Sequence, residues 1–251
     1  MITIKNKIAI KKMETAGSKL ESILLKLNKH VVPGASTHDI DLWIEEQLRE
    51  RGLDTRMKGY RGYQHVSCIS VNDMVVHGVP SGSTILRNTD FVTIDVCASF
   101  KGYCADMARQ FFVGQVDQKT KDLARVAQEA LDAGISCAVP GNRLGDISSA
   151  IQQVIESNGY GVVRDFAGHG LGKRMHEDPE ILNYGIPGTG PILRDGMTFA
   201  IEPMITMGDY KVFIDKDGWT VKTVDGSRAA HVEDTILISN QGPRILTRSN
   251  L

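Results

Sequence analysis

Two stretches of this chain repeat each other at a fixed spacing of 107 residues. Residues 32–52 align with residues 139–159, and residues 85–95 align with residues 192–202. The alignment holds 11 identities at 32 positions, where average residue usage gives about two. No linker rich in proline, glycine, serine or charge separates the copies. The sequence therefore predicts one pseudo-twofold domain over residues 1–251, built of two internal repeats at approximately 5–112 and 118–240.

Each copy opens with two predicted helices. In the first copy, apolar residues recur at helical spacing over residues 5–30. Ser36, followed three residues later by Asp39, offers an N-cap for a second helix that Gly52 ends. The matching helices of the second copy are expected at residues 118–137 and in the segment that stops at Gly159. Because strands follow each helix pair, the predicted fold class is α/β, or α+β.

The end of the first copy reads as a β-hairpin. Residues 91–97 form an apolar, β-branched strand, residues 99–102 supply the turn, and residues 103–112 run back. If the turn centres on Phe100 and Lys101, Asp95 lies opposite Asp106 with Cβ atoms about 5 Å apart. Either one of these acids holds a proton, or a cation sits between them, or both face water.

Three further residues strengthen the reading that a cation sits there. The 107-residue spacing maps Asp95 onto Glu202, so both copies are expected to end an apolar strand with an acid. His169 lies in a glycine-rich segment, residues 166–172, and Glu233 lies in a strand pattern, residues 231–238. Taken singly, the histidine could be incidental and the glutamate solvated. Taken together they predict a site for two divalent metals.

The donor types narrow the choice of metal. Four carboxylates and one imidazole suit Mn, Fe(II) or Co, whereas zinc favours more nitrogen or sulfur and is the less typical choice. The rest of the composition argues against other functions. A net charge of −1 gives no electrostatic case for nucleic acid or an anionic membrane. The four cysteines lack CxxC spacing and no signal peptide is evident, so a cytoplasmic protein is expected.

Five motifs, in order along the chain, resemble those of type I methionine aminopeptidases. They are Asn72-Asp73 with His77-Gly78, Ile94-Asp95 with Ala105-Asp106, Gly168-His169-Gly170 with His176-Glu177, Ile201-Glu202-Pro203-Met204, and Glu233-Asp234-Thr235. The resemblance runs from about residue 8 to the C-terminus. It implies the pseudo-twofold pita-bread fold, in which two pairs of helices flank a central antiparallel sheet. It also implies removal of the initiator methionine from nascent proteins when the second residue is small.

The resemblance assigns a role to each site residue. Asp95 would chelate one metal, Asp106 and Glu233 would bridge both, and His169 and Glu202 would complete the other. A hydroxide activated by the two metals would attack the scissile carbonyl, with Glu202 also accepting a proton. His176 would contact the substrate carbonyl, and His77 the amide nitrogen of the leaving side. The methionine pocket would be lined by Tyr60, Tyr63, Cys68, Met175 and Trp219.

Three residues depart from the family pattern. Met175 stands where phenylalanine is often found, and Arg61 and Asp234 stand where histidine is common. Asp234, next to Glu233, is expected to alter the hydrogen bonds around the ligands and so the metal preference. None of the three removes a predicted ligand, so the reaction class is unaffected.

Two alternative functions remain open on this fold. One is an Xaa-Pro aminopeptidase or prolidase, although those enzymes generally carry an additional N-terminal domain, for which the early first helix leaves no room. The other is a non-catalytic binding module, which would have lost metal ligands that this chain keeps. We expect a monomer that acts on the N-terminal methionine of nascent polypeptides, without direct nucleic-acid specificity or membrane attachment, and the resemblance leaves contact with the ribosome open.

Overall fold

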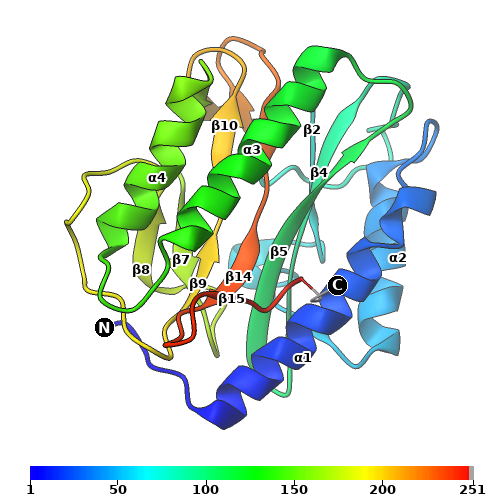
Figure 1. Cartoon of the computed structure of the whole chain (residues 1–251). Coiled ribbons are helices and arrows are strands. Elements are labelled where there is room, and N and C mark those ends of the chain that lie inside the picture. Colours follow the sequence, from blue (N-terminus) through cyan, green and yellow to red (C-terminus); the bar gives the residue numbers. More distant parts are fainter. Residues whose placement is uncertain (249–251) are drawn as a thin grey trace.

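A computed structural model describes residues 1–248 of the chain (Figure 1). Its α-helices form two pairs, one in each half of the chain. They are α1 (Lys7–Leu24), α2 (Thr37–Glu50), α3 (Gln118–Ser136) and α4 (Leu144–Ser157). No helix in these residues has the length and apolar character needed to cross a bilayer.

The predicted helices are confirmed, with one difference in length. Ser36 caps α2 through its side chain, which accepts a hydrogen bond from the backbone N–H of Asp39, as expected. The predicted first helix, residues 5–30, ends early, at Leu24. The chain then tightens into the 3₁₀ turn η1 (Leu27–Lys29), which buries Leu27 against the same core and so continues the apolar pattern past the helix.

The described strands pair antiparallel throughout and form four sheets. The first holds β1 (Asp54–Thr55), β2 (Cys68–Val71), β4 (Phe91–Phe100) and β5 (Tyr103–Phe112). The second holds β7 (Ala167–Gly170), β8 (Glu177–Leu182), β9 (Thr198–Ile201), β14 (Asp234–Leu237) and β15 (Arg244–Ile245). The third holds β6 (Gly161–Val162), β10 (Met204–Thr206) and β13 (Ala229–His231). The fourth holds β3 (Met74–Val76), β11 (Val212–Ile214) and β12 (Val221–Thr223). The predicted α/β class is confirmed.

Backbone hydrogen bonds recur at the 107-residue spacing seen in the sequence. The Gly34 N–H donates to the Leu86 oxygen at 2.8 Å, and the Gly141 N–H donates to the Leu193 oxygen at 3.1 Å. Both glycines have positive φ, 91° and 95°, a backbone conformation that residues with a side chain rarely adopt. Two isolated bridges repeat in the same way, Ser36 to Ile85 and Arg143 to Ile192. The two halves therefore share a local backbone arrangement at these positions.

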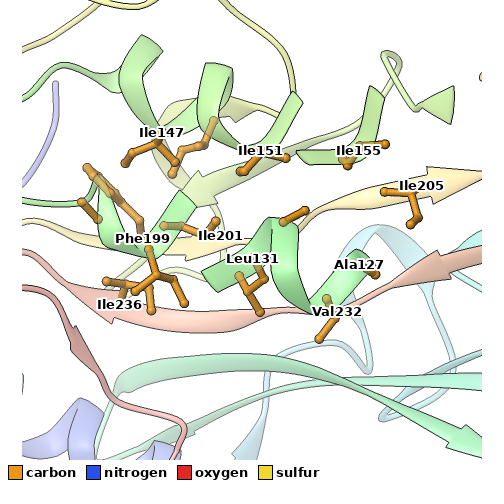
Figure 2. Close-up of a cluster of buried hydrophobic side chains, with 14 of the residues drawn as sticks. Ala127, Leu131, Ile147, Ile151, Ile155, Phe199, Ile201, Ile205, Val232 and Ile236 are labelled. Atoms are coloured by element: carbon orange, nitrogen blue, oxygen red, sulfur yellow. The ribbon is translucent and has the colours of Figure 1, made fainter. Parts of the chain in front are cut away.

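Each helix pair covers its own apolar core. Figure 2 shows the core of the second half, where Leu131 of α3 and Ile151 of α4 lie with Phe199 and Ile201 of β9. In the first half, Val92, Ile94, Val96 and Ala98 of β4 pack into the core beneath α1 and α2. Because side chains alternate along a strand, Asp95 and Cys97 point to the other face. The helices thus leave one sheet face free for a polar site.

The two larger sheets meet where β5 passes β14. An isolated antiparallel bridge joins Ala108 of β5 to Glu233, the residue before β14. Beside it, the Thr235 hydroxyl accepts a hydrogen bond from the backbone N–H of Asp106 and donates one to the backbone carbonyl oxygen of Asp106, each at 2.8 Å. This junction brings Asp106, from the first half, against Glu233, from the second.

Candidate functional site

An open cleft of about 740 Å³ lies at this junction. Every residue that the sequence assigned as a metal ligand, a catalytic group or a wall of the methionine pocket lines it. These are Tyr60, Tyr63, Cys68, His77, Asp95, Asp106, His169, Met175, His176, Glu202, Trp219 and Glu233. They come from segments spread over most of the chain, so the fold alone brings them together.

Asp95 and Asp106 share a face of the β4–β5 hairpin but are not opposite each other. Asp95 pairs with Ala108, and Asp106 pairs with Cys97. The predicted register was wrong because the turn centres on Lys101 and Gly102, both with positive φ, and not one residue earlier. A two-residue turn of this kind matches the twist of the flanking strands. Moving the turn by one residue changes the residue opposite Asp95 by two positions, from Asp106 to Ala108. The two acids therefore remain diagonal neighbours on the same face.

The acids of the second half differ from their predicted settings in smaller ways. Glu202 does follow an apolar strand, β9, as expected. Its counterpart Asp95 does not end a strand, because β4 continues to Phe100. The predicted strand at residues 231–238 is interrupted between β13 and β14, and Glu233 lies in the interruption. Its backbone turns there to bridge Ala108, which directs the side chain into the cleft.

His169 lies between two of these acids. Its Nε2 is 3.5 Å from Glu202 Oε1 and 3.8 Å from Asp106 Oδ2. Its Nδ1 lies 3.0 Å from the Gly170 oxygen, so a proton on Nδ1 satisfies that carbonyl and leaves Nε2 free to act as a ligand. The neighbouring Gly168 is packed so closely that an added Cβ would lie 2.4 Å from the Ala200 oxygen. Glycine is therefore required beside this histidine.

Burial and mutual repulsion disfavour negative charge on the four carboxyl groups. Burial, followed by the charge of Glu202, raises the pKa of Asp106 to about 7. Burial also raises the pKa values of Asp95, Glu202 and Glu233 well above their ordinary range. The same burial lowers the pKa of His169 to about 3, so its imidazole is neutral at neutral pH. A divalent cation bound among these groups would offset the cost of their negative charge.

The donor set fits divalent metal. Ligand atoms of Asp106, His169 and Glu233 lie within 4.8 Å of one another. Glu233 Oε1 is buried with no hydrogen-bond partner among residues 1–248, which is an expensive arrangement unless something binds it. No lysine or arginine in this described part of the chain forms an ion pair with the four acids; only histidines approach them. Asp95 and Glu202 adjoin the group of three and extend it.

Two other histidines line the cleft. Burial lowers the pKa of His77 to about 4, and its ring meets Phe166 edge-on at 5.5 Å. The exposed His176 lies beside His169, with ring centres 4.4 Å apart. Its Nδ1 is 3.0 Å from the Tyr60 hydroxyl, which fixes the ring. Burial of part of the ring and the nearby Arg61 charge lower the pKa of His176, so that it too is neutral at neutral pH.

The five residues predicted for an apolar pocket lie in one region of the cleft. Tyr63 and Trp219 meet edge-on at 5.0 Å, and the Tyr63 hydroxyl donates to the Ser67 oxygen at 2.9 Å. Tyr63 and Cys68 are buried in one cluster, against which Met175 and Trp219 pack. Tyr60 borders this region through its contact with His176.

Asp234 does not act as expected. Its carboxylate is fully buried and accepts from Arg109 at 2.7 Å, Arg248 at 2.6 Å and Thr247 at 2.7 Å, and it does not line the cleft. Arg109 also donates a hydrogen bond to the backbone carbonyl oxygen of Glu233 at 2.6 Å. Asp234 therefore anchors the backbone of Glu233 from behind and makes no hydrogen bond to the ligand side chains.

Sequence reasoning missed one buried histidine of the site. His231 is only 2% exposed, and its Nε2 lies 3.4 Å from Glu202 Oε2. The signal was present, because His231 lies two positions before Glu233 and strand alternation puts such residues on one face. His231 itself does not line the cleft, whereas Phe166 and Cys97 line it without having been assigned a role.

Several known proteins are similar to this chain over nearly its whole length. Residues 11–240 match the model of metallopeptidase family M24. The chain is 45% identical over 247 residues to a methionine aminopeptidase of Clostridium acetobutylicum, covering 98% of this chain and 99% of that protein. A methionine aminopeptidase structure from Thermotoga maritima matches with a TM-score of 0.97 at 45% identity, covering 99% of this chain and 100% of that one.

A more distant match bears on the fold alone. A prolidase structure from Pyrococcus furiosus matches with a TM-score of 0.79 at 24% identity, covering 99% of this chain and 66% of that one. Together with the structure from Thermotoga maritima, it confirms the fold expected from the sequence motifs.

Proposed function

The chain belongs to metallopeptidase family M24, and we propose that it is a methionine aminopeptidase that removes the initiator methionine when the second residue is small. The observation that carries the proposal is the full-length similarity to methionine aminopeptidases, together with a cleft at which Asp106, His169 and Glu233 converge. The reaction is the hydrolysis of one peptide bond at a free N-terminus.

Five residues are proposed to hold two divalent ions. Asp95 would hold one ion, His169 and Glu202 would hold the other, and Asp106 and Glu233 would serve both. Oxygen-rich donors with a single imidazole favour Mn, Fe or Co over Zn. Bound there, such ions would supply Lewis-acid chemistry, polarising the scissile carbonyl and lowering the pKa of water. The orphaned Glu233 Oε1 and the raised pKa values of the acids support this assignment.

Side chains around the ions are proposed to handle protons and charge. Glu202 would accept the proton that the attacking water gives up. If the Tyr60 hydroxyl donates to His176 Nδ1, the neutral ring carries its proton on Nε2 and can donate to the developing oxyanion. His77, also neutral, is proposed to contact the amide nitrogen of the leaving side.

The substrate side chain is proposed to enter the apolar part of the cleft. Aromatic walls and a thiol suit a flexible thioether, which gains from sulfur–aromatic contacts. The residues assigned to this pocket are Tyr60, Tyr63, Cys68, Met175 and Trp219. Met175 in place of a rigid ring keeps an apolar wall that adapts more readily to its contents.

The wider setting is part of the same proposal. The substrate is the N-terminal methionine of a nascent chain, so the enzyme acts in the cytoplasm, as a monomer, within reach of the ribosome. The whole chain forms one peptidase domain built of two internal repeats, approximately 5–112 and 118–240. The recurring hydrogen bonds at Gly34 and Gly141 support this division.

A peptide assay tests the proposed specificity. Protein stripped of metal with a chelator and then given Mn(II), Fe(II), Co(II) or Zn(II) separately should cleave Met-Ala-Ser but not Met-Lys-Ser or Ala-Pro peptides. Activity is expected with Mn, Fe or Co, and the chelated protein without added metal is the control. Preferential cleavage of Xaa-Pro bonds would transfer the assignment to the prolidase group. Metal binding without cleavage of any of these peptides would contradict the proposal.

A further inference from the structure

The imidazole of His231 is a buried polar group that the proposed mechanism does not use. It ends β13, is only 2% exposed, and its Nε2 has no hydrogen-bond partner among residues 1–248. A buried donor or acceptor left in this way costs about 1–3 kcal/mol. A histidine that served only the packing of the core would be expected to have this nitrogen satisfied. Its placement therefore calls for an explanation.

A carboxyl oxygen of a proposed metal ligand lies close to this nitrogen. His231 Nε2 lies 3.4 Å from Glu202 Oε2, and His169 Nε2 lies 3.5 Å from Glu202 Oε1. The carboxylate of Glu202 is thus bracketed by two imidazoles, one facing each oxygen. His169 lines the cleft, whereas His231 does not, so His231 approaches Glu202 from the protein side.

The main chains of both residues are fixed independently of this contact. The backbone carbonyl oxygen of Glu202 accepts a hydrogen bond from the Asn183 side chain at 3.0 Å. The His231 backbone pairs with Met204 of β10, and its oxygen accepts from the Thr93 hydroxyl at 3.3 Å. What remains free is the rotation of the Glu202 carboxylate about its side-chain bonds. A contact to the carboxylate itself is needed to set that rotation.

We propose that His231 is a positioning residue for Glu202. Its Nε2–H donates a hydrogen bond to Glu202 Oε2 when metal is bound, which turns Oε1 toward His169 and the ion that the two residues share. The inference rests on the proposed function, because it requires Glu202 to be a ligand. It follows the general rule that carboxylates bound to a metal are themselves held by hydrogen bonds from surrounding groups.

Metal titration of the stripped protein tests this role. With Mn(II) followed by calorimetry, His231→Leu should weaken binding about 10–100-fold, as is usual when a group supporting a ligand is lost. His231→Gln, which keeps an N–H donor, should stay close to wild type. The matched control is His65→Leu. His65 Nδ1 also faces a buried carboxylate, Asp41, at 3.0 Å, but lies outside the cleft lining, so metal affinity should not change.

The visible spectrum of the Co(II)-loaded protein separates positioning from direct ligation. If His231 only orients Glu202, the d–d bands of His231→Gln match those of wild type in position and intensity. A spectrum that reports one nitrogen ligand fewer would overturn the proposal, because His231 would then be a ligand itself. Wild-type Mn(II) affinity in a folded His231→Leu would also overturn it, as would a His231→Gln that loses as much affinity as the leucine variant.

A second variant and a wild-type measurement distinguish the loss of the positioning role from misfolding and from failure of the proposed function. Should His231→Leu not fold, His231→Met removes the donor with a flexible side chain that fills the same space, and the same 10–100-fold loss is expected. Wild-type protein is measured alongside for Mn(II) stoichiometry and for cleavage of Met-Ala-Ser. Wild type that binds metal and cleaves this peptide while His231→Leu binds equally well sinks the positioning role alone. Wild type that does neither sinks the proposed function.

Discussion

Replacing Thr235 by valine should destabilise the protein far more than the loss of one hydroxyl suggests. The Thr235 hydroxyl satisfies both the N–H and the oxygen of Asp106, each at 2.8 Å, and the side chain is completely buried. Valine has nearly the same shape but cannot replace either hydrogen bond. Two buried backbone groups are then left unsatisfied, at about 1–3 kcal/mol each, which gives a loss of about 2–6 kcal/mol.

Urea unfolding of the metal-free protein, followed by circular dichroism, measures this loss. The control is Thr235→Ser, which keeps the hydroxyl and gives up one methyl group, worth about 1 kcal/mol. The valine variant should also bind Mn(II) more weakly, because the Asp106 main chain is no longer held against β14. A valine variant no less stable than the serine variant would refute the reasoning, since the two hydrogen bonds would then contribute nothing to the free energy of unfolding.

Three further results are expected. Glu233→Ala should abolish divalent-metal binding by calorimetry without destabilising the metal-free protein, because Glu233 Oε1 has no partner among residues 1–248; unchanged metal content would contradict the two-metal site. Asp234→Ala should lower stability by about 3–5 kcal/mol in urea, since it strands the Arg109 and Arg248 charges, yet both metals should still bind. A stability loss below 1 kcal/mol would count against the ion pairs.

The third result concerns pH. The folded pKa of His77, about 4, lies below its ordinary value, so protonation favours the unfolded chain as pH falls from 6.5 to 4. That loss amounts to about 3 kcal/mol, and His77→Gln should remove it when stripped protein is unfolded in urea at pH 7 and at pH 4. Equal acid sensitivity in wild type and variant would show that His77 is not the group responsible.

Much of the fold and of the candidate site could be predicted from the sequence because it depends on local residue patterns. The helices, the N-cap of Ser36 and the return strand of the hairpin depend on neighbouring residues, and they were confirmed except that the first helix ends at Leu24 and not at residue 30. The register was predicted wrongly because the turn was placed on Phe100 and Lys101, whereas it lies on Lys101 and Gly102. A two-residue turn that matches the strand twist takes positive φ at both positions, which glycine adopts readily and phenylalanine does not.

What the sequence concealed depended on contacts between distant segments. The interruption at Glu233 arises because its backbone pairs with Ala108, 125 residues earlier, which no periodicity encodes. Asp234 was expected to influence the ligands, but Arg109 and Arg248 draw it to the opposite side. His231 was overlooked because its partner, Glu202, lies on another strand segment altogether.

The bridge between Ala108 and Glu233 has a consequence for how the chain would behave if it were cut. Asp95 and Asp106 precede the loop at residues 113–117, whereas His169, Glu202 and Glu233 follow it. A fragment ending in that loop would carry only carboxylate donors, and its complement would hold the sole proposed imidazole ligand. Neither fragment alone could assemble the proposed donor set, so metal uptake by a mixture of the two would report their reassociation directly.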